Sequence, residues 1–239
     1  MEKVKQYYEK IASQYDASLQ KWGYKDVIEE YITQAKIKLS PKPQILDLGC
    51  GTGIAMTKLK EMYPDATIIG LDISKNMLDL CKSKEPDVHL IQGDYNKQEF
   101  YDFESGKEYT FEPNSFDLII STGSLTEYGN LKAVIPFLFS LLKPNGYLTN
   151  IGHRKGLINW IILQFWKGKS TGKKEFIKEC IHFGFESAHS ISMSLGKSIW
   201  AWRKYCAVAK TPEESVVRNL KLGSNSFGAA QKLETSVAN

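Results

Sequence analysis

Residues 44–53 read QILDLGCGTG, and this stretch decides the fold. Its apolar start runs into three glycines at alternate positions, Gly49, Gly51 and Gly53, and a helical pattern begins at Ile54. A buried strand followed by a glycine turn and a helix presents a nucleotide-sized ligand at the carboxyl edge of an open α/β sheet. Because glycine has no Cβ, such a turn permits positive φ and lets a ligand lie directly against the backbone.

The spacing of these glycines separates two classes of cofactor. A dinucleotide turn reads G-x-G-x-x-G/A and would need Gly or Ala where this chain has Ile54. Asp47 stands two positions before the first glycine, where a carboxylate would repel a pyrophosphate but attract a cation. The stretch resembles motif I of class I S-adenosylmethionine (SAM) methyltransferases; the alternative is a glycine turn of another α/β fold. The resemblance implies that the methionine end of SAM is held by Asp47, Gly49, Cys50, Gly51 and Gly53.

Composition narrows the class of protein. The chain has 239 residues, of which 42% are hydrophobic and 24% charged, so we expect one domain or one domain with a small appendage. A net charge of +4 does not call for nucleic acid as a partner. The four cysteines show no C-x-x-C spacing and no metal-ligand pattern, which favours structural thiols in a reducing compartment. Without an apolar leader or a membrane-length apolar run, we expect a soluble cytoplasmic protein.

Residues 2–37 show helical spacing of apolar side chains. Within them, YYEKIASQYD resembles the lead-in of small-molecule methyltransferases related to the ubiquinone and biotin-precursor enzymes. That resemblance implies that residues 1–40 form a helical cap over the cofactor. Tyr15 would then close the site above the methyl donor, with Tyr8 supporting it. Ordinary packing of helix faces is the alternative for both tyrosines.

The segment GLDISKNML, residues 70–78, resembles the second motif of the same family. Asp72 lies about twenty residues past the glycine turn, where a carboxylate at the end of the second strand accepts both ribose hydroxyls. A carboxylate suits this task because its two oxygens only accept hydrogen bonds. By resemblance, Ile73 and Met77 flank the adenine ring. The alternative is that Asp72 only caps the helix that starts near Ser74.

Two further strands are expected to border the cofactor. Residues 88–92 form a buried strand that ends in Gly93 and Asp94, and the family pattern implies that Asp94 accepts the adenine amino group, with Tyr95 nearby. A simple turn aspartate is the competing interpretation. Residues 96–114 carry no steady period and predict an enlarged loop or small hairpin. The strand SFDLIIST resembles the fourth motif, and its end at Ser121 and Thr122 should border the methionine part of SAM.

The residues facing the methyl acceptor are harder to identify. Glu127 and Tyr128, in GSLTEYG, would enter the site after this strand, with a plain helix start as the alternative. The next strand, YLTNIGH, delivers His153 to the same edge, where its titration near neutrality would let it take a proton. A histidine that satisfies a loop hydrogen bond is the alternative. We expect His153, Tyr128 or Tyr15 to orient the acceptor or move its proton.

Residues 154–174 read RKGLINWIILQFWKGKSTGKK and depart most from the family pattern. An apolar run that includes Trp160 and Trp166 is flanked by basic residues and is too short to cross a bilayer. Three structures suit it: a lid over a hydrophobic substrate, a helix packed in the core, or a helix lying in a membrane surface. In the first case both tryptophans would contact substrate.

These elements predict a Rossmann-like α/β fold with a seven-stranded sheet, mostly parallel with an antiparallel last strand, and helices on both faces. The methyltransferase domain would span residues 1–210. A turn at Pro144, Asn145 and Gly146 would precede the strand that carries His153. Residues 211–239 predict a helix from Thr211 and a frayed tail rich in Ser, Gly, Ala and Asn.

The expected activity is methyl transfer from SAM to a small-molecule acceptor, hydrophobic or amphiphilic. Position 121–124 reads STGS, not the N/D-P-P-Y/F stretch that cradles a planar base or glutamine amine. One alternative is a phospholipid or other membrane-associated lipid methyltransferase, with peripheral membrane contact. Another class of alternative is a non-catalytic module that binds SAM or a protein partner. Oligomeric state and acceptor identity do not follow from the sequence.

Overall fold

A computed structural model describes residues 2–20, 24–165, 167–191 and 204–213. Its centre is a sheet of eight strands in the order β4-β3-β2-β1-β5-β6-β8-β7. The strands are β1 (Gln44–Leu48), β2 (Thr67–Asp72), β3 (His89–Asp94), β4 (Glu99–Asp102), β5 (Phe116–Thr122), β6 (Leu142–His153), β7 (Ser187–Ile191) and β8 (Lys204–Lys210). The Rossmann-like, mostly parallel α/β fold predicted from the sequence is confirmed.

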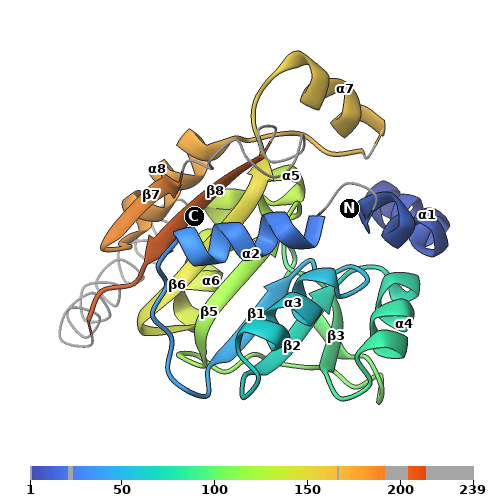
Figure 1. Ribbon diagram of the computed structural model, residues 1–239, viewed down its shortest axis with the longest axis horizontal. Coiled ribbons are helices and arrows are strands. Elements are labelled where there is room, and N and C mark those ends of the chain that lie inside the picture. The colour runs from blue at the N-terminus through green and yellow to red at the C-terminus, as the bar shows by residue number, and fades with distance from the viewer. Residues whose placement is uncertain (1, 21–23, 166, 192–203, 214–239) are drawn as a thin grey trace, which may run out of the picture.

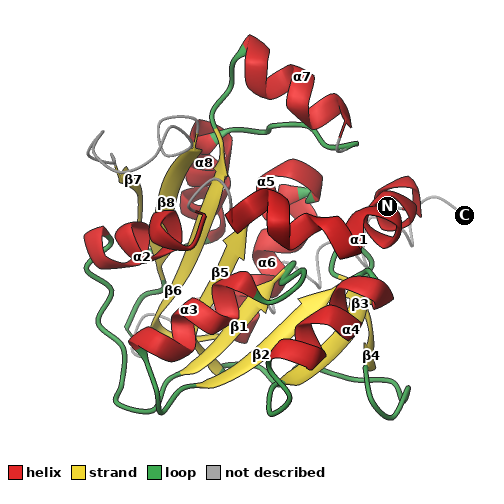
Figure 2. Ribbon diagram, turned by 45° about the vertical axis from the view of Figure 1, so that its right-hand side comes forward, coloured by secondary structure: helices red, strands yellow, loops and turns green. Residues whose placement is uncertain are grey.

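Helices cover both faces of this sheet (Figure 1). They are α1 (Glu2–Gln20), α2 (Tyr24–Gln34), α3 (Ile54–Met62), α4 (Lys75–Lys84), α5 (Leu125–Tyr128), α6 (Leu131–Leu141), α7 (Leu157–Phe165) and α8 (Lys173–Phe183). In Figure 2, α2, α3 and α4 lie on one side of the strands, while α6 and α8 lie on the other.

Alternation along the strands explains this two-sided packing. Ile45 of β1 packs with α2, α3 and α4, whereas Leu46 and Leu48 of the same strand pack with α6 and α8. Leu118 and Ile119 of β5 divide between the two cores in the same way. Successive side chains of a strand point to opposite faces, so a strand covered on both sides is apolar throughout. The apolar runs in the sequence therefore mark the centre of the sheet.

The sheet has one strand more than predicted. Residues 96–114 supply β4, which pairs antiparallel with β3 at the edge and ends in a turn whose return segment bridges Tyr101 and Glu108. The hairpin interpretation of this segment is confirmed. The segment is polar and aromatic without a steady period, and Phe100 is the only buried residue of β4, so the sequence pattern did not reveal the strand.

One strand boundary also differs from expectation. Strand β6 begins at Leu142, and the predicted turn residues lie within it as an irregularity, with Asn145 at φ 60°. The expected antiparallel end of the sheet is present, since β8 runs antiparallel to both β6 and β7. The first half of the predicted last strand lies outside the described residues, as does everything after Glu213. Residues 211–213, the expected start of the C-terminal helix, are not helical.

The sheet order places a ligand crevice at the carboxyl end of β1. Strand β1 pairs with β2 on one side and with β5 on the other, so the chain leaves β1 in one direction and later returns to its opposite edge. Ligands of open α/β sheets bind at such a switch point. Gly49, Gly51 and Gly53 follow β1 immediately, which puts the glycine turn at this crevice.

Candidate active site

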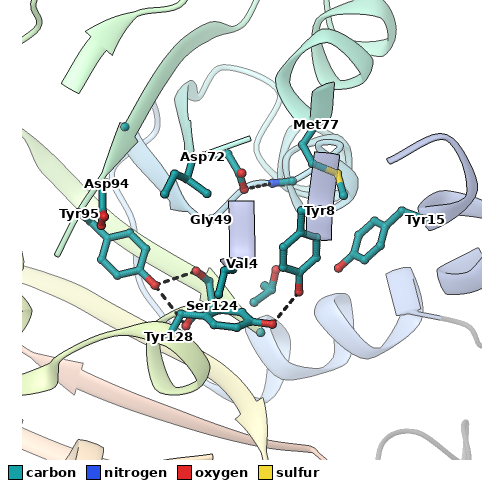
Figure 3. A pocket seen from close by; sticks show the side chains of 15 residues that line it. Val4, Tyr8, Tyr15, Gly49, Asp72, Met77, Asp94, Tyr95, Ser124 and Tyr128 are labelled. Carbon is teal, nitrogen blue, oxygen red and sulfur yellow. Dashed lines mark hydrogen bonds between the residues drawn. The ribbon is translucent and has the colours of Figure 1, made fainter. Parts of the chain in front are cut away.

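A pocket lies at the carboxyl edge of the sheet, beside the glycine turn (Figure 3). It holds about 560 Å³ of empty space, its open mouth included. It is lined by Val4, Tyr8, Tyr15, Gly49, Gly51, Asp72, Ile73, Met77, Gly93, Asp94, Tyr95, Thr122, Gly123, Ser124 and Tyr128. Segments far apart in the chain therefore meet at one cavity.

The floor of the pocket needs glycine for two reasons. Gly49 and Gly51 have φ of 76° and 54°, a conformation that side chains disfavour. A Cβ on Gly49 would also come within 2.3 Å of the Ser124 hydroxyl oxygen, so no larger residue fits there. The bare backbone is thus a requirement of the fold that also leaves room for a ligand.

Asp72, at the end of β2, ties the turn to the neighbouring strand. Its carboxylate accepts the N–H of Gly51 and the N–H of Ser74, both at 2.9 Å, and the same side chain lines the pocket. Burial raises the pKa of Asp72, although these backbone hydrogen bonds oppose the rise. The helix cap proper is the Ser74 hydroxyl, which accepts the N–H of Met77. Asp72 is therefore placed both to hold the turn and to face a ligand.

Asp47 is fully buried beneath the same turn. Neither carboxylate oxygen has a hydrogen-bond partner among the described residues. Burial, reinforced by the charge of Asp72, raises the pKa of Asp47 to about 8. Asp47 does not line the pocket itself. A buried carboxyl group whose pKa is raised by burial and by a neighbouring carboxylate suits a cationic ligand, whose charge would favour the ionised form.

Helix α1 forms the roof of the pocket. Val4, Tyr8 and Tyr15 point down from it, and the Tyr8 hydroxyl is 2.9 Å from the Tyr128 hydroxyl on α5 (Figure 3). Polar contacts attach this helix to α4: the Glu9 carboxylate accepts the N–H groups of Lys75 and Asn76, at 2.8 and 3.1 Å.

Further contacts hold the later part of α1. Asp16 pairs with Lys84 at 2.6 Å and accepts the hydroxyl of Thr52. A roof held largely by exposed polar contacts opens more easily than a packed core element.

The far end of the pocket is formed by α4 and the end of β3. Ile73 and Met77 supply apolar walls, and Gly93 and Asp94 lie across from them. One oxygen of Asp94 accepts the N–H of Asn96 at 2.9 Å, so Asp94 shapes a turn and lines the cavity as well. The Tyr95 hydroxyl lies 3.0 Å from the Ser124 hydroxyl.

Besides Asp47, three residues predicted to touch the cofactor do not line the pocket. Cys50 is buried, as are the other cysteines. Gly53 is the left-handed residue before α3, and a Cβ there would meet the Cys81 sulfur at 2.6 Å. Ser121 is fully buried, and its hydroxyl accepts the N–H of Leu125 at 2.9 Å. Each supports the shape of the turn or of α5 from behind.

The sequence interpretation missed Val4 as a lining residue, and it did not single out Gly123 and Ser124 within the stretch GSLTEYG that was expected to enter the site. Gly123 and Ser124 directly follow the end of β5, and their small polar character after an apolar run was the available signal. Val4 gave no signal, because it is one apolar residue of a helical pattern.

Glu127 and His153 belong to a buried network behind the pocket. The Glu127 carboxylate accepts the backbone N–H of His153 at 2.8 Å and lies 3.1 Å from its Nδ1, which is 3.3 Å from the Lys204 ammonium. Burial alone would raise the pKa of Glu127, but the hydrogen bonds from His153 and the charges of His153 and Lys204 lower it overall. Neither Glu127 nor His153 lines the pocket.

Tyr128 links the pocket to a second, shallower groove. This acceptor-side groove lies between α5, the start of α6 and α8, and is lined by Asn96, Tyr128, Gly129, Asn130, Leu131, Lys132, Lys169, Thr171, Glu175 and Glu179. Tyr128 is the residue that the two cavities share. Gly168 packs on the Tyr128 ring, where a Cβ would lie 2.8 Å from a ring carbon. The segment after α7 thus holds this tyrosine in place.

Trp160 lies on α7 and is 60% exposed, away from the pocket lining. Most apolar side chains of α7 are likewise exposed, which does not fit packing in the core. Trp166 lies outside the described residues.

A Rossmann-like sheet with a glycine turn at its switch point and an acid at the end of the neighbouring strand is an architecture that binds ligands with an adenosyl group. The family described as "Methyltransferase domain" matches residues 39–190. The chain therefore belongs to the methyltransferase domain family. This confirms the resemblance drawn from the glycine turn, and SAM is the cofactor that membership implies.

Individual relatives agree with this assignment. A trans-aconitate 2-methyltransferase of Enterobacter sp. is 34% identical over 48% of this chain and 41% of its own. A malonyl-[acyl-carrier protein] O-methyltransferase of Priestia megaterium is 36% identical over 44% of this chain and 34% of its own. The chain thus spans less than half the length of these curated relatives. A solved SAM-dependent methyltransferase from Thermotoga maritima shares the fold, with a TM-score of 0.63, 16% identity and coverage of 88% of this chain and 100% of that one.

Proposed function

We propose that this protein transfers a methyl group from SAM to a small-molecule acceptor. The observation that supports the proposal most directly is the pocket itself, where a bare glycine backbone, an acid at the end of β2 and an aromatic roof meet at the switch point of the sheet. The fit to SAM is chemical as well as spatial. Asp47 is a buried acid whose pKa is raised in part by the charge of Asp72, which lines the pocket, and SAM brings two cationic groups.

In this proposal the chain's own residues bind and orient the cofactor. The backbone of Gly49 and Gly51 borders the methionine end, with the charge of Asp47 behind it. Asp72 accepts the ribose hydroxyls, and Asp94 accepts the adenine amine between Ile73 and Met77. Bound SAM supplies a methyl group already activated on a sulfonium. The protein therefore needs to align the acceptor and exclude water more than to supply a strong base.

Tyr128 is the residue best placed to meet the acceptor. It lines both the pocket and the acceptor-side groove, and burial raises its pKa, so its hydroxyl acts as a neutral hydrogen-bonding group. Tyr15 would screen the site from α1. We assign Glu127 and His153 a positioning role, because their hydrogen-bonded network fixes α5, which carries Tyr128.

The acceptor-side groove also bears on the substrate class. Lys132, Lys169, Glu175 and Glu179 give it cations and carboxylates beside the apolar Leu131. This mixture suits the polar end of an amphiphilic acceptor. The named relatives act on trans-aconitate and on a malonyl carrier protein, so carboxylic acids are the first group of compounds to try.

Two measurements test the proposal. Thermal melting with SAM, its demethylated product S-adenosylhomocysteine and NADH should show stabilisation by the first two alone. A screen with radiolabelled methyl donor, covering acids and amphiphiles, should then show transfer to an acceptor, and at low SAM concentration Asp72→Ala should transfer less than the wild type. Stabilisation by NADH but not by SAM would overturn the assignment of the pocket. SAM binding without transfer to any compound would favour a non-catalytic SAM-binding module.

A further inference from the structure

Helix α7 turns its apolar side chains outward. Leu157, Ile158, Trp160, Ile161 and Phe165 are 73, 55, 60, 44 and 69% exposed. At helical spacing these five residues share one side of the helix. The opposite side carries the buried Asn159 and Leu163, and the Asn159 amide donates to the backbone oxygen of Arg154 at 2.7 Å. A helix of a water-facing surface normally has the reverse arrangement, with its apolar stripe toward the core.

The charge of the segment that carries this helix, residues 154–174, is of one sign. Residues 154–174 contain six basic and no acidic residues, whereas the whole chain carries a net charge of only +4, so the remainder is net negative. All six basic residues are exposed, and within the described part of the chain none of them forms an ion pair: Arg154, Lys155, Lys167, Lys169, Lys173 and Lys174. An outward apolar stripe between clusters of unpaired cations matches a surface that is apolar inside and anionic outside.

The helix stands off the body of the protein at the edge that holds the pocket. In Figures 1 and 2, α7 lies beyond the end of β6 and above α5. The segment that returns from it is fixed to α5, because the N–H groups of Lys169 and Thr171 donate to the backbone oxygens of Glu127 and Thr126, each at 3.0 Å. A surface that bound α7 would therefore lie on the side of the protein that holds the cofactor pocket.

We propose that α7 is an interfacial helix that docks this protein on an anionic lipid surface. The helix has nine residues, and no helix in the described part of the chain is long and apolar enough to cross a bilayer. The apolar side chains would enter the boundary between headgroups and acyl chains, and the basic residues would contact the headgroups. A protein partner is the weaker fit, because its contact would have to combine an apolar patch with a fully anionic rim.

The test is vesicle co-sedimentation of the full chain with phosphatidylcholine vesicles and with mixed phosphatidylcholine and phosphatidylglycerol vesicles. Ile161→Asp places a charge in the apolar stripe. Ile181→Asp on α8 is the matched control, since the two isoleucines are 44 and 49% exposed. We expect the wild type to bind the mixed vesicles, Ile161→Asp to lose about tenfold in apparent affinity, and the control to keep it.

A double substitution and a change of salt concentration test the electrostatic part of the proposal. Replacing Lys167 and Lys169 by Gln should weaken binding to the mixed vesicles, and raising the salt to about 0.5 M should weaken the wild type in the same way. The proposal would be overturned if the wild type did not bind the mixed vesicles. It would also be overturned if Ile161→Asp and Ile181→Asp lost vesicle affinity equally. Light scattering that shows a dimer dissolved by Ile161→Asp, without lipid binding, would instead make α7 an interface between copies. None of these readouts needs SAM, so the proposed function is tested separately.

Discussion

Replacing Asp72 by Ala tests whether the acid at the end of β2 binds the ribose or only holds the glycine turn. A hydrogen bond to a charged group contributes about 1.5–3 kcal/mol, so the loss of the ribose contact should raise the Kd for SAM about ten- to 150-fold. The substitution also removes the acceptor of the Gly51 and Ser74 N–H groups, which are both at 2.9 Å. The ligand-free protein should therefore unfold more easily as well.

Two further variants separate these effects. Asp72→Asn keeps the shape, but its amide nitrogen must face one of the two backbone N–H groups, so binding should weaken here too. Asp79→Ala, on the exposed side of α4 where Asp79 pairs with Lys75, is the control and should leave both SAM affinity and stability nearly unchanged.

The assay is calorimetric titration with S-adenosylhomocysteine and SAM, beside urea unfolding without ligand. If Asp72→Ala unfolds more easily yet binds both compounds within about twofold of the wild type, the ribose assignment is refuted. The carboxylate would then serve the turn alone.

Three other substitutions follow from the site. Tyr8→Phe removes the hydroxyl that lies 2.9 Å from the Tyr128 hydroxyl and should weaken SAM binding by about 0.5–1.5 kcal/mol in calorimetry, while Tyr7→Phe should not. Equal SAM affinities of the wild type and both variants would contradict the role of α1 as the roof of the pocket. Burial raises the pKa of Asp47 to about 8 in the folded protein, so the free energy of unfolding of the wild type should fall as pH rises from about 4 toward 8, by up to roughly 1.4 kcal/mol per pH unit. Urea unfolding of Asp47→Asn should lack this slope. Glu127→Gln breaks a buried charged network and should cost about 3–5 kcal/mol at neutral pH, against little change for the surface variant Glu186→Gln. Because the pKa of Glu127 is lowered on folding, its contribution should be present above its usual pKa and disappear on acidification, and a pH-independent difference would argue against the pairing.

The sequence by itself determined the sheet, the glycine turn and the cofactor class. These features are local: a strand, a turn that demands positive φ and an acid at a fixed separation are each encoded by neighbouring residues. Gly49, Gly51 and Asp72 could therefore be assigned to one edge before any contact was known, because parallel strands bring their carboxyl ends together. Asp94 and Met77 were implied by the family resemblance, and both line the pocket.

Only the tertiary structure decided which polar groups face the cavity. His153 ends a strand at the predicted edge, yet Glu127 and Lys204 surround it, and no periodicity in the chain relates three residues so far apart. The side on which α7 carries its apolar residues was equally beyond the sequence, since the same helical pattern describes a buried stripe and an exposed one. Burial depends on what packs against an element, and that is fixed only when distant segments meet.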